Sequence, residues 1–240
     1  MKVRFLASGD RALVVDFGDR IDRALSNDVL RLDASLRSSR LPGVVETVPT
    51  FRSLMVHYDP VATTCADLER AIASLLDRRP DPRATTILWR VPVCYEGWFA
   101  PDLGDVANRT GLAPGEVVAL HSAPRYHVYM LGFLPGFPYM GDLPHELALP
   151  RRADPRLRVP AGSVSIATTL TAIYPYESPG GWHLIGVTPI RLFDPARSRP
   201  ALLAPGDNVQ FEPIDPASFA SIRKAVDSGK YEVANEPISR

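Results

Sequence analysis

The segment richest in groups that bind anions is residues 150–163, which reads Pro-Arg-Arg-Ala-Asp-Pro-Arg-Leu-Arg-Val-Pro-Ala-Gly-Ser. Its four arginines fall within eight residues: Arg151, Arg152, Arg156 and Arg158. A guanidinium group donates two parallel hydrogen bonds to a carboxylate or phosphate, so this spacing is typical of an anion site. Gly162, followed by Ser163, would let backbone N–H groups approach the same anion. The alternative is a solvated basic loop without a ligand.

A second segment whose residues could take part in a reaction is 174–182, which reads Tyr-Pro-Tyr-Glu-Ser-Pro-Gly-Gly-Trp. Its carboxylate can serve as a general base and its serine as a hydrogen-bond donor. Its consecutive glycines permit backbone conformations closed to other residues. The alternative is an ordinary surface turn. The residues of this segment expected to act on or contact a ligand are Tyr174, Glu177, Ser178, Gly180, Gly181 and Trp182.

A third segment, residues 132–141, reads Gly-Phe-Leu-Pro-Gly-Phe-Pro-Tyr-Met-Gly. Glycines, prolines and aromatic residues at this density predict a rigid apolar loop. Phe133 and Phe137 would then form the wall of a pocket or a docking surface, because ligand sites are mostly apolar with few polar groups. The alternative is a hydrophobic turn that plugs a barrel.

Several kinds of chemistry are excluded by what the sequence lacks. Lysine occurs only as Lys2, Lys224 and Lys230, so residues 83–216 offer no P-loop or Schiff-base lysine, and no biotin attachment site is apparent. No G-x-S-x-G motif occurs. The five histidines form no tight ligand pair, so no metal site is expected.

Composition narrows the class of protein further. The 240 residues carry 27 basic and 27 acidic side chains, a balance that argues against nucleic-acid binding. No apolar run reaches the roughly 20 residues that span a bilayer, and no signal peptide is visible, so we expect a cytoplasmic protein with no membrane partner. The isolated Cys65 and Cys94 are expected to be buried thiols.

The first third of the chain has the pattern of an α+β domain. Apolar residues at positions 21, 25, 29, 32 and 36 predict one helix, which Pro42-Gly43 would end, and Thr64 can cap a second. Strands are predicted at 3–6, 12–17, 44–49, 53–58 and 86–93. This order, ββαββαβ, is close to a ferredoxin-like sandwich. The polar, proline-stiffened residues 78–82 predict a boundary between domains 1–82 and 83–240.

The rest of the chain holds eighteen of the 24 prolines between residues 83 and 216, so it must be rich in loops and strands. Two short helices are predicted, one after Pro101-Asp102 and one from Pro114. The expected strands are residues 126–131, 164–168, 183–187, 191–193 and 208–212. They predict an antiparallel barrel or sandwich with working loops, followed by a last helix from Asp215-Pro216.

Long stretches of this sequence resemble the family of 5-oxoprolinase B subunits, also described as Kip-inhibitor type or as allophanate hydrolase subunit 1, a carboxyltransferase domain subunit. The motifs that carry the resemblance are Gly132-Phe-Leu-Pro-Gly-Phe-Pro-Tyr139, Arg158-Val-Pro-Ala-Gly-Ser163 and Tyr174-Pro-Tyr-Glu-Ser-Pro-Gly-Gly-Trp182. Shorter matches are Val91-Pro-Val-Cys-Tyr95, Asp102-Leu103, His121-Ser122, Thr188-Pro189, Leu202-Leu-Ala-Pro-Gly-Asp207 and Arg52-Ser-Leu54.

The resemblance implies a fold, partners and a reaction. The second domain would be a cyclophilin-like β-barrel, and the chain would act with the C and A subunits of the same complex. Together they would cleave 5-oxoproline to glutamate with ATP hydrolysis, the ATP being held with or by the partner subunits. Developing phosphate and oxyanion charge must then meet preorganised donors.

The residues expected to carry this function follow from the matched motifs. Expected catalytic residues are Arg158, Glu177, Tyr174 and His121. Expected substrate-binding residues are Phe133, Phe137, Arg151, Pro160, Gly162, Ser163, Ser178, Gly180, Gly181 and Trp182.

The sequence departs from the family pattern at Glu96, Ala100, Leu170 and Ala172. These departures leave the true substrate open. Two alternative functions also stay open: a regulatory protein that inhibits a sensor histidine kinase, and the carboxyltransferase-like half of a urea- or amide-carboxylating system.

Overall fold

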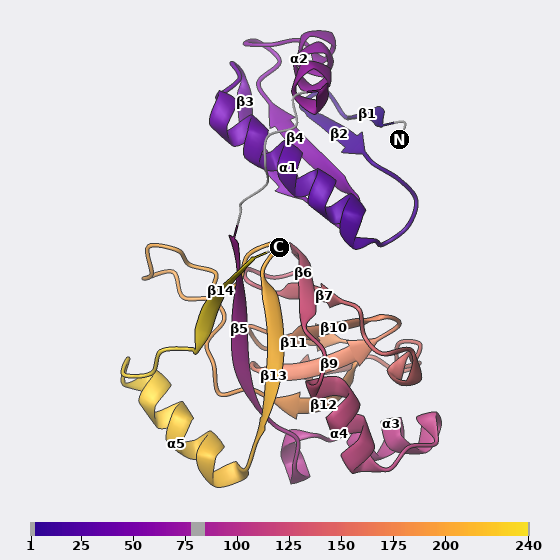
Figure 1. Cartoon of the computed structure of the whole chain (residues 1–240), viewed down its shortest axis with the longest axis vertical. Coiled ribbons are helices and arrows are strands. Elements are labelled where there is room, and N and C mark those ends of the chain that lie inside the picture. Colours follow the sequence, from indigo (N-terminus) through magenta and orange to yellow (C-terminus); the bar gives the residue numbers. More distant parts are fainter. Residues whose placement is uncertain (1–2, 78–84, 240) are drawn as a thin grey trace. The chain divides into compact units, whose positions relative to one another are not determined.

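The computed structural model describes residues 3–77 and 85–239. The chain forms two units, Met1–Ala84 and Thr85–Arg240 (Figure 1). The boundary segment predicted at residues 78–82 lies outside the described residues. Each unit has its own apolar core. No helix among the described residues has the length and hydropathy needed to cross a membrane.

The first unit is a four-stranded antiparallel sheet with two helices. Its elements are β1 Arg4–Ser8, β2 Ala12–Asp16, α1 Arg23–Ser39, β3 Val44–Pro49, β4 Ser53–Tyr58 and α2 Cys65–Asp77. The strand order is β1-β2-β4-β3. Apolar side chains of both helices share one core with the sheet, from Val29 on α1 and Ile72 on α2 to Leu54 on β4.

Local capping explains where the two helices begin. The Asp22 carboxylate accepts from the backbone N–H groups of Ala24 and Leu25 at the start of α1. At α2 the Asp67 N–H donates to the Thr64 hydroxyl over 3.1 Å, as the sequence predicts. These caps satisfy N–H groups that have no partner within the helix.

The ferredoxin-like prediction for this unit is not confirmed. Its expected last strand, residues 86–93, is part of β5 Thr85–Cys94, and β5 pairs with strands of the second unit. In the sheet of the first unit, the edge strand beside β2 is β1 rather than β5. The predicted boundary at residues 78–82 put this strand in the second domain, although the element order had counted it with the sandwich. Local periodicity identifies a strand but not the strands it will pair with.

The second unit contains a closed β-barrel. Its remaining strands are β6 Tyr126–Leu131, β7 Pro138–Gly141, β8 Arg156–Val159, β9 Ser163–Ala167, β10 Leu170–Ile173, β11 Ser178–Gly180, β12 His183–Val187, β13 Asn208–Ile214 and β14 Asn235–Ser239. Its helices are α3 Leu103–Thr110, α4 Pro114–Ser122 and α5 Pro216–Asp227, with 3-10 turns η1 Gly97–Phe99 and η2 His145–Leu147.

The barrel closes through one residue pair between β12 and β5, the strands at the two ends of the barrel's strand order. The order β12-β9-β10-β7-β6-β13-β5 returns to β12 where Val187 pairs with Cys94. Closure removes the exposed edges of an open sheet. In Figure 1, α5 lies to one side of the barrel beside β5, and α3 and α4 lie together near β12.

Two features of the barrel differ from the sequence prediction. The strands β13 and β5 run parallel over seven paired residues, although we expected an antiparallel barrel. These strands are far apart in the chain, so no tight hairpin forces them to be antiparallel. The strand predicted at residues 191–193 is reduced to one isolated bridge between Phe193 and Ala201.

A fully buried histidine joins α4 to the barrel. The Tyr95 hydroxyl and the Thr171 hydroxyl lie 2.8 and 2.9 Å from the two ring nitrogens of His121. Because the Thr171 hydroxyl donates its proton to the Ser165 carbonyl, it must accept from Nε2–H of His121. Nδ1 then accepts from Tyr95, and the ring is neutral.

This environment gives His121 a structural role. Its ring is 0% exposed, stacks on Phe211 at 4.6 Å, and has both nitrogens occupied. Burial lowers the pKa of His121 from 6.5 to about 3. His121, which the sequence led us to expect as a catalytic residue, therefore has no exposed surface through which it could contact a substrate.

The buried ring makes the stability of the second unit depend on pH. The unfolded chain binds a proton at His121 below pH 6.5, whereas the folded chain resists protonation until about pH 3. Stability from this group is complete above pH 6.5 and falls as the pH drops toward 3, by about 1.4 kcal/mol per pH unit. We expect denaturant unfolding to show a loss of about 2 kcal/mol at pH 5 from this group, absent in His121→Gln.

A direct measurement on the ring checks the same prediction. The His121 resonances in NMR spectra should not titrate between pH 8 and pH 5. Titration of this ring near pH 6.5 would contradict the buried, neutral state.

Candidate functional site

The apolar loop that follows β6 is built from two consecutive tight turns. The Leu134 N–H donates to the Gly132 carbonyl over 2.8 Å, which makes a γ-turn centred on Phe133 with φ of 68°. The Phe137 N–H then donates to the Leu134 carbonyl over 3.0 Å, with Gly136 at φ of 77°. Pro followed by Gly at the centre of this second turn is the preference of a type II turn.

These turns send two phenylalanines in different directions. Phe137 is buried, whereas the Phe133 side chain is 60% exposed. A bulky residue at positive φ costs free energy, of order 1–3 kcal/mol, and such strain is concentrated at functional sites. The Phe133 ring is therefore exposed on a strained segment of backbone.

An aromatic cluster joins this loop to the segment 174–182. The Phe137 ring lies 5.1 Å from Tyr174 and 6.3 Å from Trp182, in edge-to-face geometry. Tyr139 contacts Phe137 and Trp182 at 4.9 and 6.1 Å. Arg151 places its guanidinium carbon 5.9 Å from the Trp182 ring centre. Residues from all three predicted segments thus meet here.

Tyr174 is the buried centre of the cluster. Burial and the nearby Tyr139 phenol raise the pKa of Tyr174 to about 12, although Arg151 and Arg156 act in the opposite direction. Its phenol is therefore neutral near pH 7 and can donate a hydrogen bond but cannot act as a base. A side chain at Gly180 would collide with the Tyr174 hydroxyl, so glycine is required there.

Two of the four arginines are held by a buried carboxylate. Asp102, 3% exposed, accepts from Arg152 Nη1 at 3.1 Å and from both Nη1 and Nη2 of Arg156 at 2.9 and 2.6 Å. The Leu184 N–H also donates to it, over 2.6 Å. These arginines therefore join the loop before β8 and the first residue of β8 to the start of α3 and to β12.

The other two arginines reach the solvent. Arg151 is exposed beside Trp182, as described above. Arg158 on β8 forms two parallel hydrogen bonds, from Nε and Nη2, to the Glu177 carboxylate at 2.9 and 3.0 Å. Both side chains of this pair are exposed, so water and solutes can compete for it.

The backbone around Gly162 holds the segments together. The Gly162 N–H donates to the Tyr174 carbonyl over 2.7 Å, and the Ser163 N–H donates to the Pro160 carbonyl over 3.2 Å. Both amides are thus used inside the protein, which differs from the expectation that they would bind an anion. Gly162, at φ of 85°, also admits no side chain, because a Cβ would lie 2.6 Å from the Thr188 carbonyl.

The remaining predicted site residues lie on or beside the two-stranded sheet formed by β8 and β11. The strands β8 and β11 pair with Ser178 opposite Val159 and Gly180 opposite Arg156. The Gly181 carbonyl accepts from the Arg152 N–H over 2.8 Å. The exposed Pro160 directly follows β8. The structure therefore brings together all the predicted site residues except His121.

Some features of this region were missed from the sequence. The sequence identified Asp102 only as part of a motif. Its role as acceptor was missed because nothing in the sequence pairs an acid before a helix with an arginine 50 residues away. The open groove described below is lined by none of the predicted site residues. Within residues 3–77 and 85–239, no group of three or more His, Cys, Asp and Glu side chains could hold a metal ion.

Comparison with known proteins defines the class. The family model of the carboxyltransferase domain, subdomain C and D, matches residues 3–203. The whole chain is also similar in fold to the Kluyveromyces lactis urea amidolyase, with a TM-score of 0.82 at 22% identity, covering 98% of this chain and 16% of that one. The barrel is consistent with the cyclophilin-like fold expected from the resemblance. The chain belongs to the carboxyltransferase domain family.

Within that family the chain is similar over nearly its whole length to chains named as the B subunit of 5-oxoprolinase. One, from Bacillus subtilis, is 37% identical over 90% of this chain and 95% of its own length. Another, from Escherichia coli O157:H7, is 40% identical over 88% of this chain and 96% of its own length. The recognition of the family of 5-oxoprolinase B subunits from sequence motifs is thereby confirmed.

The Asp102 cluster generates a stability prediction. Asp102→Asn removes the charge that two partly buried guanidinium groups share, and breaking such a pair costs about 3 kcal/mol. We expect denaturant unfolding followed by circular dichroism to show this loss. Glu212→Gln, whose exposed carboxylate lies 3.6 Å from Arg90, should cost less than about 1 kcal/mol. Equal effects of the two substitutions would contradict the assigned role of Asp102.

Proposed function

We propose that this chain is the B subunit of a cytoplasmic, ATP-dependent 5-oxoprolinase that works with the A and C subunits of that enzyme. The observation that carries the proposal is similarity over nearly the whole length of two chains named as 5-oxoprolinase B subunits. We further propose that the substrate meets this chain at the rim formed by Arg151, Arg158 and Glu177, next to the aromatic cluster.

The chemistry of the substrate supports this location. 5-Oxoproline is a five-membered cyclic amide that carries a carboxylate. The exposed guanidinium groups of Arg151 and Arg158 suit a carboxylate, since each can donate two parallel hydrogen bonds. The exposed Phe133 ring and the adjoining cluster suit the apolar edge of the small ring.

ATP has a clear part in such a reaction. The ring amide is a poor electrophile, and transfer of a phosphoryl group to its carbonyl oxygen would activate the carbon toward water. One water opens the ring by breaking the C–N bond, and a second releases the phosphoryl group as phosphate. In this scheme Glu177, once displaced from Arg158, accepts a proton from water, and Tyr174 supports the site as a neutral phenol. We assign ATP to the assembled complex.

A carboxyltransferase-like function is the second candidate. The family description and the similarity in fold to a urea amidolyase favour it. Such a function needs a biotin carrier from another polypeptide, so avidin would stop the activity. Inhibition of a sensor kinase remains a third hypothesis, to which the exposed Phe133 and Leu157 side chains would contribute an apolar surface.

The proposed function is tested by glutamate formation from 5-oxoproline and ATP in the reconstituted complex. We expect Arg158→Ala and Glu177→Gln each to lower kcat/KM by about 100-fold or more, because a positioned acid–base group contributes at least that factor. Both side chains are exposed, so the fold should survive, as circular dichroism would verify. Absence of ATP-dependent glutamate formation by the wild-type complex would reject the function itself.

Two controls separate substrate contact from a structural ion pair. Arg90→Ala removes an exposed arginine that pairs with Glu236 at 2.9 Å, and should leave activity unchanged. The charge swap Arg158→Glu with Glu177→Arg restores the ion pair but reverses its contacts with substrate. Recovery of full activity in the swapped protein would show that the pair is only structural.

A further inference from the structure

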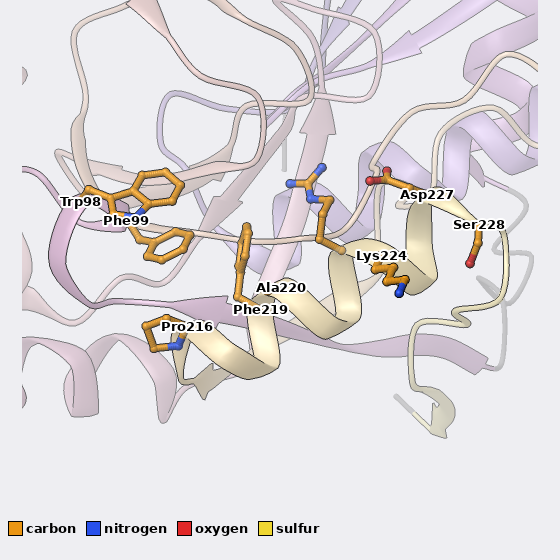
Figure 2. A pocket seen from close by; sticks show the side chains of 9 residues that line it. Trp98, Phe99, Pro216, Phe219, Ala220, Lys224, Asp227 and Ser228 are labelled. Carbon is orange, nitrogen blue, oxygen red and sulfur yellow. The ribbon is translucent and has the colours of Figure 1, made fainter.

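An open groove of about 700 Å³ lies between η1 and α5 in the second unit. Figure 2 shows the rings of Trp98, Phe99 and Phe219 at one end and the polar side chains of α5 at the other. We refer to the space lined by Trp98, Phe99, Phe219, Ala220, Arg223 and Lys224 as the α5 groove.

One ring at the apolar end of the α5 groove is largely exposed. The Trp98 side chain is 76% exposed and stacks on Phe99 at 3.8 Å, and Phe99 in turn packs on Phe219 at 4.5 Å. Phe219 and Ala220 of α5 line the groove beside these rings, whereas the half-buried Ile222 and Val226 lie outside its lining. The exposed Trp98 ring therefore leaves an apolar surface at this end of the groove that a partner could cover.

The other end of the groove carries positive charge without a balancing acid. The Arg223 guanidinium lies 5.5 Å from the Phe219 ring centre, and its Nη2 donates to the Thr188 carbonyl over 3.3 Å. Within residues 3–77 and 85–239, no carboxylate forms an ion pair with Arg223 or Lys224. The nearby Asp227 lies 3.6 Å from Arg191, which offsets its charge.

We propose that the α5 groove is the docking surface for another subunit of the complex. The occupant is a segment of that subunit with an apolar side chain, seated against Trp98 and Phe219, and a carboxylate paired with Arg223. Tryptophan and arginine are the residues that most often dominate binding at protein interfaces. The groove is open along its length, which suits a protein segment better than a small molecule that must be enclosed. This inference rests on the proposed function, since it requires a partner protein.

The groove also lies next to the backbone that organises the candidate site. Arg223 Nη2 would be 3.7 Å from a Cβ built on Gly162, and the Gly162 N–H holds the Tyr174 carbonyl. The Thr188 carbonyl, which Arg223 contacts, is within the same turn region because the Thr188 N–H donates to the Gly162 carbonyl over 2.9 Å. A docked partner would therefore sit close to the segments that carry the proposed substrate residues.

The proposal is tested by measuring the affinity of the chain for the purified A and C subunits by biolayer interferometry. We expect Trp98→Ala and Arg223→Glu each to weaken binding about 30-fold or more. Binding by the wild type should also weaken as salt rises from about 50 to about 300 mM, and less so for Arg223→Gln, because a charge pair is screened. Circular dichroism of the free variants reports their folding.

Matched substitutions outside the groove serve as controls. Val61→Ala removes an exposed apolar side chain, and Arg20→Glu reverses an exposed charge, both in the first unit. Both should bind the partner subunits as the wild type does. Light scattering of the chain alone tests for a second copy as the occupant: a dimer that Trp98→Ala dissociates would overturn the proposal.

The outcomes separate docking from catalysis. Wild-type affinity in both groove variants would reject the α5 groove and leave the proposed function intact. A complex that forms, is weakened by the groove variants and yet makes no glutamate would support the docking surface and reject the function. A wild-type chain that binds neither of the partner subunits would reject both.

Discussion

The arrangement of the candidate site depends on one buried carboxylate. Asp102 accepts hydrogen bonds from Arg152 in the loop before β8, from Arg156 at the start of β8 and from the backbone of β12, so three parts of the chain share one acceptor. A buried carboxylate is tolerated only when its charge and its lone pairs are satisfied, which makes this geometry narrowly defined. Of the four arginines in residues 150–163, Arg152 and Arg156 bind Asp102, whereas Arg151 and Arg158 extend into solvent.

The aromatic cluster and the backbone at Gly162 hold the other two segments of the site, residues 132–141 and 174–182, in place. Tyr174 receives a backbone hydrogen bond from Gly162 at its carbonyl while its ring packs on Phe137. The glycines at 162 and 180 leave room for the Thr188 carbonyl and the Tyr174 hydroxyl. The candidate site therefore combines a mostly apolar base with exposed charged side chains, Arg151, Arg158 and Glu177, beside it.

Exposed groups on this unit fall on two different surfaces. Phe133 and the Arg158–Glu177 pair belong to the loops of the candidate site, whereas Trp98 and the half-buried face of α5 belong to the groove. Exposed aromatic residues beside an arginine that forms no ion pair are typical of surfaces that become buried on assembly. A chain whose relatives are named as part of a multi-subunit enzyme is expected to keep such a surface uncovered when it is alone.

The sequence alone determined the local elements and the segments that meet at the site. Spacing and caps located α1, α2 and α5, the density of glycine and proline predicted a rigid loop at residues 132–141, and the motifs identified the family. Only the tertiary structure decided which sheet β5 joins, that β5 and β13 run parallel, and which arginines are free of Asp102. The physical reason is that propensity and capping act within a few residues, whereas strand pairing and burial join residues far apart in the chain.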